Sequence, residues 1–186
     1  MSISNVYFSF CCQRDRRTLL FGVLAVLLTF FVATRGHAQS NNNHLMLSTG
    51  ISYERGFDAS IAYEHGSKYH NAWEYFAAYH IKYEDDPIAG HITKQSFWHS
   101  YNSWHVGIVY KPCVDRGRNH HGNARIGASG GSDLSDFVGG LHVGYEHTFA
   151  LKGGWELFFQ VKEDVILPRS GDLFRTGAMF GVKVPL

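Results

Sequence analysis

Apolar and polar residues alternate along most of the chain from residue 45 to residue 186. The segment 72–84 shows the pattern most clearly. Its apolar set of alternate residues is Trp73, Tyr75, Ala77, Tyr79, Ile81 and Tyr83, and the intervening set is Glu74, Phe76, Ala78, His80 and Lys82. A period of two residues predicts a β-strand with one apolar face. Because the apolar face is rich in aromatic residues and the other face carries charge, the pattern is typical of a transmembrane β-barrel.

Eight segments carry this alternation and predict eight strands. They span residues 44–53, 57–65, 72–84, 97–111, 123–130, 136–150, 155–167 and 174–186. Turn-forming residues separate them, among them Glu54-Arg55-Gly56, 152–154 and 168–171, and Pro112 closes the fourth segment. No segment after residue 38 predicts a helix. The predicted fold class is therefore all-β: an antiparallel membrane β-barrel of about eight strands.

The apolar faces of the predicted strands are expected to point outward, toward lipid. They place Trp73, Tyr75, Trp98 and Trp104 on the outside of the barrel. Aromatic side chains near strand ends are typical of the interfaces of a membrane. The alternative is a soluble antiparallel sandwich, whose strands also alternate but whose apolar faces point inward. Turn spacing and the large number of aromatic residues favour the barrel.

The N-terminus predicts secretion. Arg14, Arg16 and Arg17 precede the uncharged apolar run 19–33, and Gly36 and Ala38 form a small-x-small site. This is the pattern of a cleaved signal peptide, and the alternative is a signal anchor that stays in place. The predicted organisation is a signal peptide at 1–38 and an outer-membrane β-barrel domain at 39–186, which predicts localisation in the cell outer membrane.

Removal of the signal peptide changes the charge of the chain. Four arginines and one aspartate leave, so the formal net charge falls from +1 to about −2. A chain without a basic surplus is not expected to bind nucleic acid directly. Cys113 is then the single cysteine, which excludes an internal disulfide.

The inward faces of the predicted strands carry nearly balanced charge. The acids are Glu54, Asp58, Glu64, Glu74, Glu146, Glu156 and Asp164, and the bases are Lys82, Lys111, Arg125, Lys162, Arg175 and Lys183. A barrel of eight strands has room inside only for side chains. Charges buried there must pair, because an unpaired one costs several kcal/mol. The sequence therefore predicts a lumen plugged by ion pairs rather than an open pore.

Candidate chemistry is sparse, and we expect no catalytic, cofactor-binding or metal-binding residue. His120 and His121 are adjacent, but no cysteine or carboxylate stands at a convincing ligand spacing. Some outer-membrane barrels are lipid-modifying enzymes that combine serine, histidine and an acid. The residues that suit this alternative are His99, Ser100, Ser103, His105, Ser48 and Ser60. Nothing in the sequence fixes a nucleophile and a base among them, so the prediction is a non-enzymatic protein.

Several strand segments resemble a known family. They read ARIGASGG at 124–131, DFVGGLHVGYEHTF at 136–149, ELFFQVKEDVIL at 156–167, GDLFRTGAMFGVKV at 171–184 and YEHGSKYHNAWEYFAAY at 63–79. This order is similar to the conjugal transfer protein TraO family of bacteroidete conjugative transposons. The resemblance implies an outer-membrane component of a conjugation apparatus related to type IV secretion, without a catalytic motif. The last residue, Leu186, departs from the terminal aromatic residue common in outer-membrane barrels.

The expected partners are other envelope proteins of the conjugation apparatus, together with outer-membrane lipid. If both termini are periplasmic, strand counting places the connection 85–95 outside the cell and the basic connection 116–121 in the periplasm. We expect the basic connection to dock to partners through Arg116, Arg118, His120 and His121. The alternative is a small adhesin-like barrel that binds through its loops.

Overall fold

The computed structural model describes residues 43–99, 101–133, 136–167 and 173–186. The predicted signal peptide at 1–38 and the predicted turn at 168–171 lie outside these residues. Every described residue belongs to one compact unit, 41–186. Among the described residues, no helix is both long and apolar enough to cross a bilayer.

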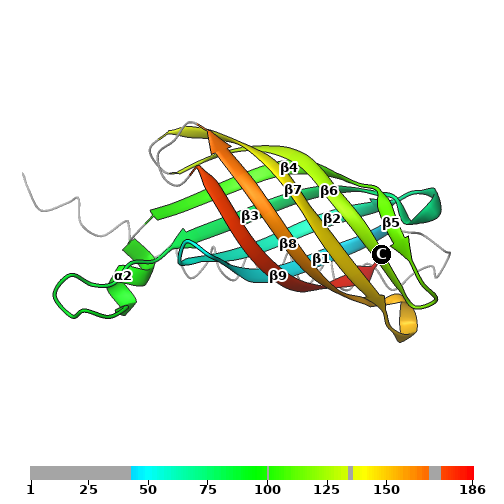
Figure 1. Cartoon of the computed structure of the whole chain (residues 1–186), viewed down its shortest axis with the longest axis horizontal. Coiled ribbons are helices and arrows are strands. Elements are labelled where there is room, and N and C mark those ends of the chain that lie inside the picture. Colours follow the sequence, from blue (N-terminus) through cyan, green and yellow to red (C-terminus); the bar gives the residue numbers. More distant parts are fainter. Residues whose placement is uncertain (1–42, 100, 134–135, 168–172) are drawn as a thin grey trace, which may run out of the picture. The chain divides into compact units, whose positions relative to one another are not determined.

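The described unit is a closed antiparallel barrel (Figure 1). Its wall consists of β1 (Asn43–Ser52), β2 (Gly56–Gly66), β3 (Ala72–Lys82), β4 (Tyr101–Lys111), β6 (His120–Ser132), β7 (Phe137–Ala150), β8 (Glu156–Leu167) and β9 (Phe174–Pro185). Strands consecutive around the wall pair antiparallel, β1 pairs with β9, and β4 pairs with β6 to close the ring. In the ring of eight strands every strand is paired on both sides, which is the condition for β-structure to span a membrane. The predicted fold class is confirmed.

The short strand β5 (Cys113–Arg116) continues β4 beyond Pro112. Proline has no amide hydrogen, so it cannot donate to a strand ladder. The carbonyl of Pro112 nevertheless accepts a hydrogen bond from the amide of Ala124 at 3.0 Å, and β5 pairs with the first residues of β6. The sequence correctly predicts the end of β4 at Lys111, but it misses the β5–β6 hairpin that extends past the barrel wall.

Several boundaries differ from prediction. Residues 94–99 form the helix α2 (Lys94–His99), so the fourth strand begins at Tyr101 and Trp98 lies on a helix, not on an outward strand face. Thr93 and Ser96 cap this helix reciprocally: each backbone amide donates to the other side-chain oxygen, at 3.0 and 3.1 Å. The short 3₁₀ helices η1 (Lys68–His70) and η2 (Lys152–Gly154) occupy turns, and β6 runs longer than predicted in both directions. The expectation of no helix was therefore wrong.

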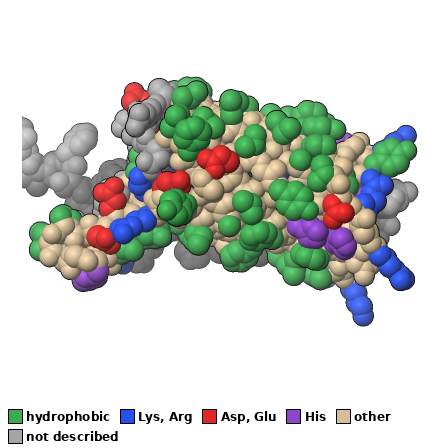
Figure 2. Space-filling view, viewed as in Figure 1, with side chains coloured by type: hydrophobic (Ala, Val, Ile, Leu, Met, Phe, Trp, Pro, Cys, Tyr) green, Lys and Arg blue, Asp and Glu red, His purple; other side chains and the backbone are tan. Residues whose placement is uncertain are grey.

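The apolar faces point outward, as predicted. Trp73, Tyr75 and Trp104 keep 42%, 51% and 46% of their surface exposed. Figure 2 shows apolar side chains distributed over the barrel wall. Ile81 is an exception at 3% exposure, because the end of β3 lies near α2, whose Phe97 stacks on Tyr83. An exposed aromatic exterior excludes the soluble sandwich and, with the closed barrel, confirms the outer-membrane localisation.

The two ends of the barrel differ. The start of β1 and the end of β9 lie at one end, with the connections β2–β3, β4–β6 and β7–β8; we call this the termini end. The other end, the loop end, carries the connections β1–β2, β3–β4, β6–β7 and β8–β9. The connection β3–β4 with α2 projects from the loop end, and the β5–β6 hairpin projects from the termini end (Figure 1).

Candidate functional site: a charged interior and a basic rim

Six charged residues fill the barrel interior toward the termini end. We call them the glutamate cluster: Glu64, Glu74, Glu146, Lys111, Arg125 and Lys183. They come from β2, β3, β7, β4, β6 and β9, so almost the whole wall contributes. Glu64 and Glu74 stand directly opposite each other across β2 and β3. Two like charges in that position destabilise a sheet unless a cation lies between them.

Lys111 supplies that cation, and the other two bases complete a closed network. Its ammonium contacts Glu64, lies 3.3 Å from Glu74 and lies 2.5 Å from Glu146. Lys183 lies 2.9 Å from Glu64 and 2.8 Å from Glu146. The guanidinium of Arg125 donates to both carboxylate oxygens of Glu74 at 2.6 and 2.7 Å, and to Glu146 at 2.8 Å. Three acids thus meet three bases, and each acid contacts at least two of them.

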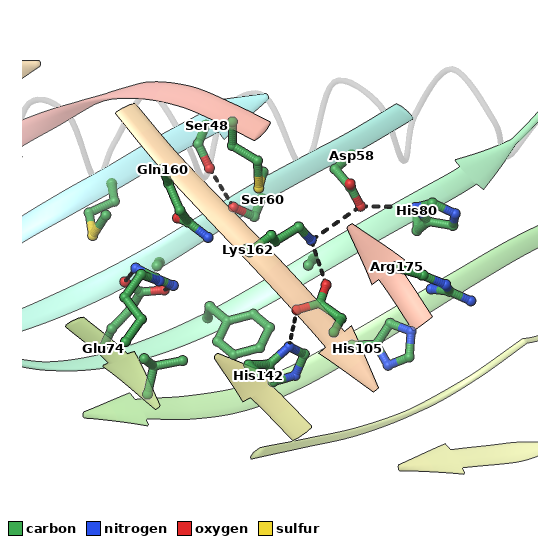
Figure 3. Close-up of a pocket in the computed structure, with 18 of the residues that line it drawn as sticks. Ser48, Asp58, Ser60, Glu74, His80, His105, His142, Gln160, Lys162 and Arg175 are labelled. Atoms are coloured by element: carbon green, nitrogen blue, oxygen red, sulfur yellow. Dashed lines mark hydrogen bonds and ion pairs between the residues drawn. The ribbon is translucent and has the colours of Figure 1, made fainter. Parts of the chain in front are cut away.

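A second group lies nearer the loop end. We call it the aspartate cluster: Asp58, Asp164, Lys162, His80 and His142 (Figure 3). Lys162 lies 2.7 Å from Asp164 and 3.6 Å from Asp58. Each aspartate also contacts one imidazole: His80 lies 3.0 Å from Asp58, and His142 lies 2.7 Å from Asp164. Two acids therefore share one lysine, and histidines take the remaining contacts.

Apolar residues and a small cavity accompany the two clusters. Met46, Ala62 and Phe158 form a buried apolar group, with Phe76 packed against it. A cavity of about 50 Å³ is lined by residues of both clusters, among them Glu74, Arg125, Asp58 and Lys162. This volume suits one or a few water molecules and is far below the several hundred Å³ of a small-molecule site. The prediction of an interior filled by paired charge agrees with this geometry.

Three of the residues considered for catalysis, Ser48, Ser60 and His105, line the interior cavity (Figure 3). The hydroxyls of Ser48 and Ser60 bond to each other at 2.6 Å. Ser103 lies 3.2 Å from the His105 ring and accepts a hydrogen bond from Arg175 at 3.2 Å. Ser100 and the His99 side chain lie outside the described part of the chain. The prediction that these residues carry no catalytic role is not tested by this arrangement.

Sequence reasoning missed one serine–histidine–aspartate chain. The Ser129 hydroxyl lies 2.6 Å from Nε2 of His142, whose Nδ1 lies 2.7 Å from Asp164. These are the contacts of a hydrolase triad. However, Ser129 does not line the interior cavity, and Asp164 is also bound by Lys162. The three residues lie on β6, β7 and β8, so only the register of three strands, not their spacing in sequence, brings them together.

The termini end presents a basic rim. Lys68, Arg116, Arg118 and Lys152 are exposed there, on three different connections. Figure 2 shows lysine, arginine and histidine side chains gathered at this end. The sequence identified Arg116 and Arg118 but not the two lysines, since single lysines in separate turns carry no signal of their own.

The predicted docking residues are not equally available. His121 keeps only 9% exposure, and its ring stacks on His70 with a centroid distance of 4.8 Å. Arg116 donates to the carbonyl of Tyr69 at 2.6 Å and lies over its ring. Arg118 is exposed and His120 is partly so. His121 is thus buried, because β6 begins earlier than predicted and holds it against the barrel, while docking through this connection stays a prediction.

The connection 85–95 at the loop end is ordered by local hydrogen bonds. Asp86 accepts from the amides of Ile88 and Ala89 at 2.9 and 3.2 Å, and these bonds lower the pKa of its carboxyl group. Asp85 pairs with Arg55 at 2.7 Å, which raises the pKa of the guanidinium. Ile88 is 97% exposed at the tip.

Comparisons with known proteins identify the fold. The crystal structure of Neisserial surface protein A (NspA) is similar with a TM-score of 0.53 and 14% identity, over 77% of this chain and 94% of that one. A structure from the de novo design of transmembrane β-barrels covers 78% of this chain and 98% of its own, with 9% identity and a TM-score of 0.48. No family model and no curated protein matches the sequence. The likeness to NspA shows that the chain has the outer-membrane β-barrel fold, and its resemblance to the TraO family stays a prediction.

Proposed function

We propose that this protein is a non-enzymatic outer-membrane component of a conjugative DNA-transfer apparatus, and that it acts by protein–protein contacts. The resemblance of its strand segments to the TraO family supports the apparatus. The observation that carries a contact role is the closed interior: Glu146, Lys111 and Lys183 are completely buried in one ion-pair network. A barrel plugged in this way offers its ends and its outer wall, not its lumen, to other molecules.

The basic rim is the proposed docking surface. Lys68, Arg116, Arg118 and Lys152 outnumber Asp115, the exposed acid of the β5–β6 hairpin. A rim of one sign of charge favours a partner with an acidic surface, because complementary potentials steer association. With both termini in the periplasm, this rim faces the envelope proteins of the apparatus.

A transfer assay tests the proposal. Deletion of the gene should reduce the transfer frequency of the element strongly, and complementation should restore it. A variant with Lys68→Gln, Arg118→Gln and Lys152→Gln should complement poorly while the barrel still inserts. The matched control is Arg55→Gln with Lys94→Gln at the loop end, which removes exposed cations without changing the rim. Undiminished transfer after deletion would refute the function, whereas full activity of the rim variant alone would refute only the docking surface.

A closed lumen has its own test. Planar-bilayer recordings of the purified protein should show no large, steady conductance, because the glutamate cluster occupies the interior. Steady conductance would contradict the contact role and favour transport.

The second candidate function is a lipid-modifying enzyme, and one observation favours it. Ser129, His142 and Asp164 form a hydrogen-bonded chain of the triad type. A fluorophosphonate probe that labels the native protein at Ser129, and not the Ser129→Ala variant, would establish a reactive serine. Absence of labelling would leave the contact role.

A further inference from the structure

The geometry points to a zinc-binding site on the β5–β6 hairpin, formed by Asp115, His120 and His147. Each of these side chains offers one ligand atom, and the three atoms lie within 4.8 Å of one another. Imidazole nitrogen and carboxylate oxygen are ligands of Zn²⁺, and three protein ligands leave a fourth position for water or for a group from another molecule.

The site joins three strands at the termini end of the barrel. Asp115 lies on β5, His120 begins β6, and His147 lies near the end of β7. The hairpin turn brings the first two together, because the Gly117 amide donates to the His120 carbonyl at 2.9 Å. The absence of a side chain at Gly117 is required, since a Cβ there would collide with the His120 ring.

His120 is placed as a metal ligand. Its Nδ1 is shielded from solvent, makes no hydrogen bond and lies 3.9 Å from the Asp115 carboxylate. Its ring stacks on that of His147 with a centroid distance of 5.2 Å. A shielded nitrogen without a partner is costly, and a bound cation would satisfy it.

Tyr145 is a positioning residue for His147. Its hydroxyl lies 3.0 Å from Nδ1 of His147. When that nitrogen donates its proton to the hydroxyl, Nε2 keeps its lone pair and is ready to bind a metal. Zn²⁺ needs ligands at about 2.0–2.2 Å in a tetrahedral arrangement, so the ligand atoms must approach one another by up to about 1.5 Å. Partial exposure of Asp115 and His120 leaves room for that adjustment.

The other cluster of metal-ligating groups is already paired with a lysine. His44, Glu64 and Glu156 also lie close together, but Lys183 pairs with Glu64 at 2.9 Å and with Glu156 at 3.8 Å. The ammonium already supplies the positive charge there. No lysine or arginine pairs with Asp115 in the ion pairs of the described residues, and this difference selects the hairpin site.

Isothermal titration of the folded, tag-free protein with Zn²⁺ in detergent micelles tests the inference. We expect one ion per chain, and a loss of affinity of roughly tenfold or more in His120→Ala, in His147→Ala and in Asp115→Asn. Tyr145→Phe should weaken binding less than these. The matched control is His91→Ala, which removes an exposed histidine at the loop end. Heat-modifiable migration on gels shows that each variant is still a folded barrel.

Cobalt provides a second readout that a merely structural effect would not change. Co²⁺ in the same site should give visible d–d absorption in the wild type and lose it in His147→Ala. Wild-type protein that binds no Zn²⁺ overturns the inference. So does unchanged affinity in the His120→Ala/His147→Ala double variant, or binding that depends on His70 instead. None of these outcomes bears on the proposed role in conjugation, which the transfer assay tests separately.

Discussion

The two charged clusters inside the barrel both pair buried acids with bases, but they do so with different residue types. In the glutamate cluster three acids and three permanent cations are matched, and Lys111, Lys183 and Glu146 have no exposed surface. In the aspartate cluster Asp58 and Asp164 share Lys162, and His80 and His142 make the other contacts. Among the described residues, the three completely buried charged side chains thus belong to the glutamate cluster, whereas the aspartates have one lysine between them and each contacts an imidazole. Because unpaired buried charge is so costly, the matched cluster can close the lumen fully.

The largest effect is expected from Glu146, because it contacts all three cations of the glutamate cluster. Glu146→Ala leaves those cations with too little negative charge and should reduce the free energy of unfolding by about 3–5 kcal/mol. Urea titration in micelles, followed by tryptophan fluorescence, measures it. Glu146→Gln, which keeps the volume, separates the loss of charge from the loss of packing. If Glu146→Ala reduced the free energy of unfolding by less than about 1 kcal/mol, the glutamate cluster would not be the more stabilising of the two clusters.

The pair of Arg125 and Glu74 should show strong coupling. Among the described residues, Arg125→Met leaves Glu74 only Lys111, at 3.3 Å, and Glu74→Gln leaves Arg125 only Glu146, at 2.8 Å. Each change removes one charge from a buried pair and should cost about 3 kcal/mol. The double variant removes both charges of a pair with two parallel hydrogen bonds, at 2.6 and 2.7 Å. It should cost about 1–3 kcal/mol less than the sum of the single changes. Strict additivity in this double-mutant cycle would show that the two residues act independently.

A smaller effect is expected in the aspartate cluster. Asp164→Asn should reduce the free energy of unfolding by about 1–2 kcal/mol. The amide oxygen still accepts a hydrogen bond from His142 or Lys162, and Lys162 keeps Asp58 at 3.6 Å. The same urea titration compares it with Glu146→Gln, the equivalent isosteric change. If Asp164→Asn reduces the free energy of unfolding more than Glu146→Gln does, the glutamate cluster is not the main source of stability in the interior.

The smallest effects belong to the exposed charges of the loop end. Asp86 has a pKa below its usual range because two backbone amides donate to it. Because the folded-state pKa of Asp86 is depressed, its carboxylate stabilises the loop at every pH above the unfolded-state pKa, about 3.9. This stabilisation is lost as the pH falls through the lower pKa of the folded state. The Ile88 and Ala89 amide signals in NMR should hence stay constant from pH 7 to about 5 and shift only below. A transition near neutral pH would contradict the assignment.

Much of the fold could be predicted because a strand with one face toward lipid records its orientation in every second residue. Trp73, Tyr75 and Trp104 were placed outward by that alternation alone. The prediction failed where another signal competed with the alternation. Thr93 and Ser96 cap a helix in a segment that also reads as strand, and Pro112 marks a strand end although pairing resumes in β5.

The sequence predicted that the interior is charged, but not which of its acids and bases pair. Sequence alone determined that acids and bases share the inner face in nearly equal number, because parity fixes the face of each residue. The tertiary structure decided which charges meet, because barrel closure and strand register set the heights at which side chains from distant strands converge. Lys183 reaches Glu64 across 119 residues of sequence in this way. The same register brings Ser129, His142 and Asp164 into hydrogen-bonding distance. The turn at Gly117 brings His120 close to His147. The spacing of these residues along the chain reveals neither contact.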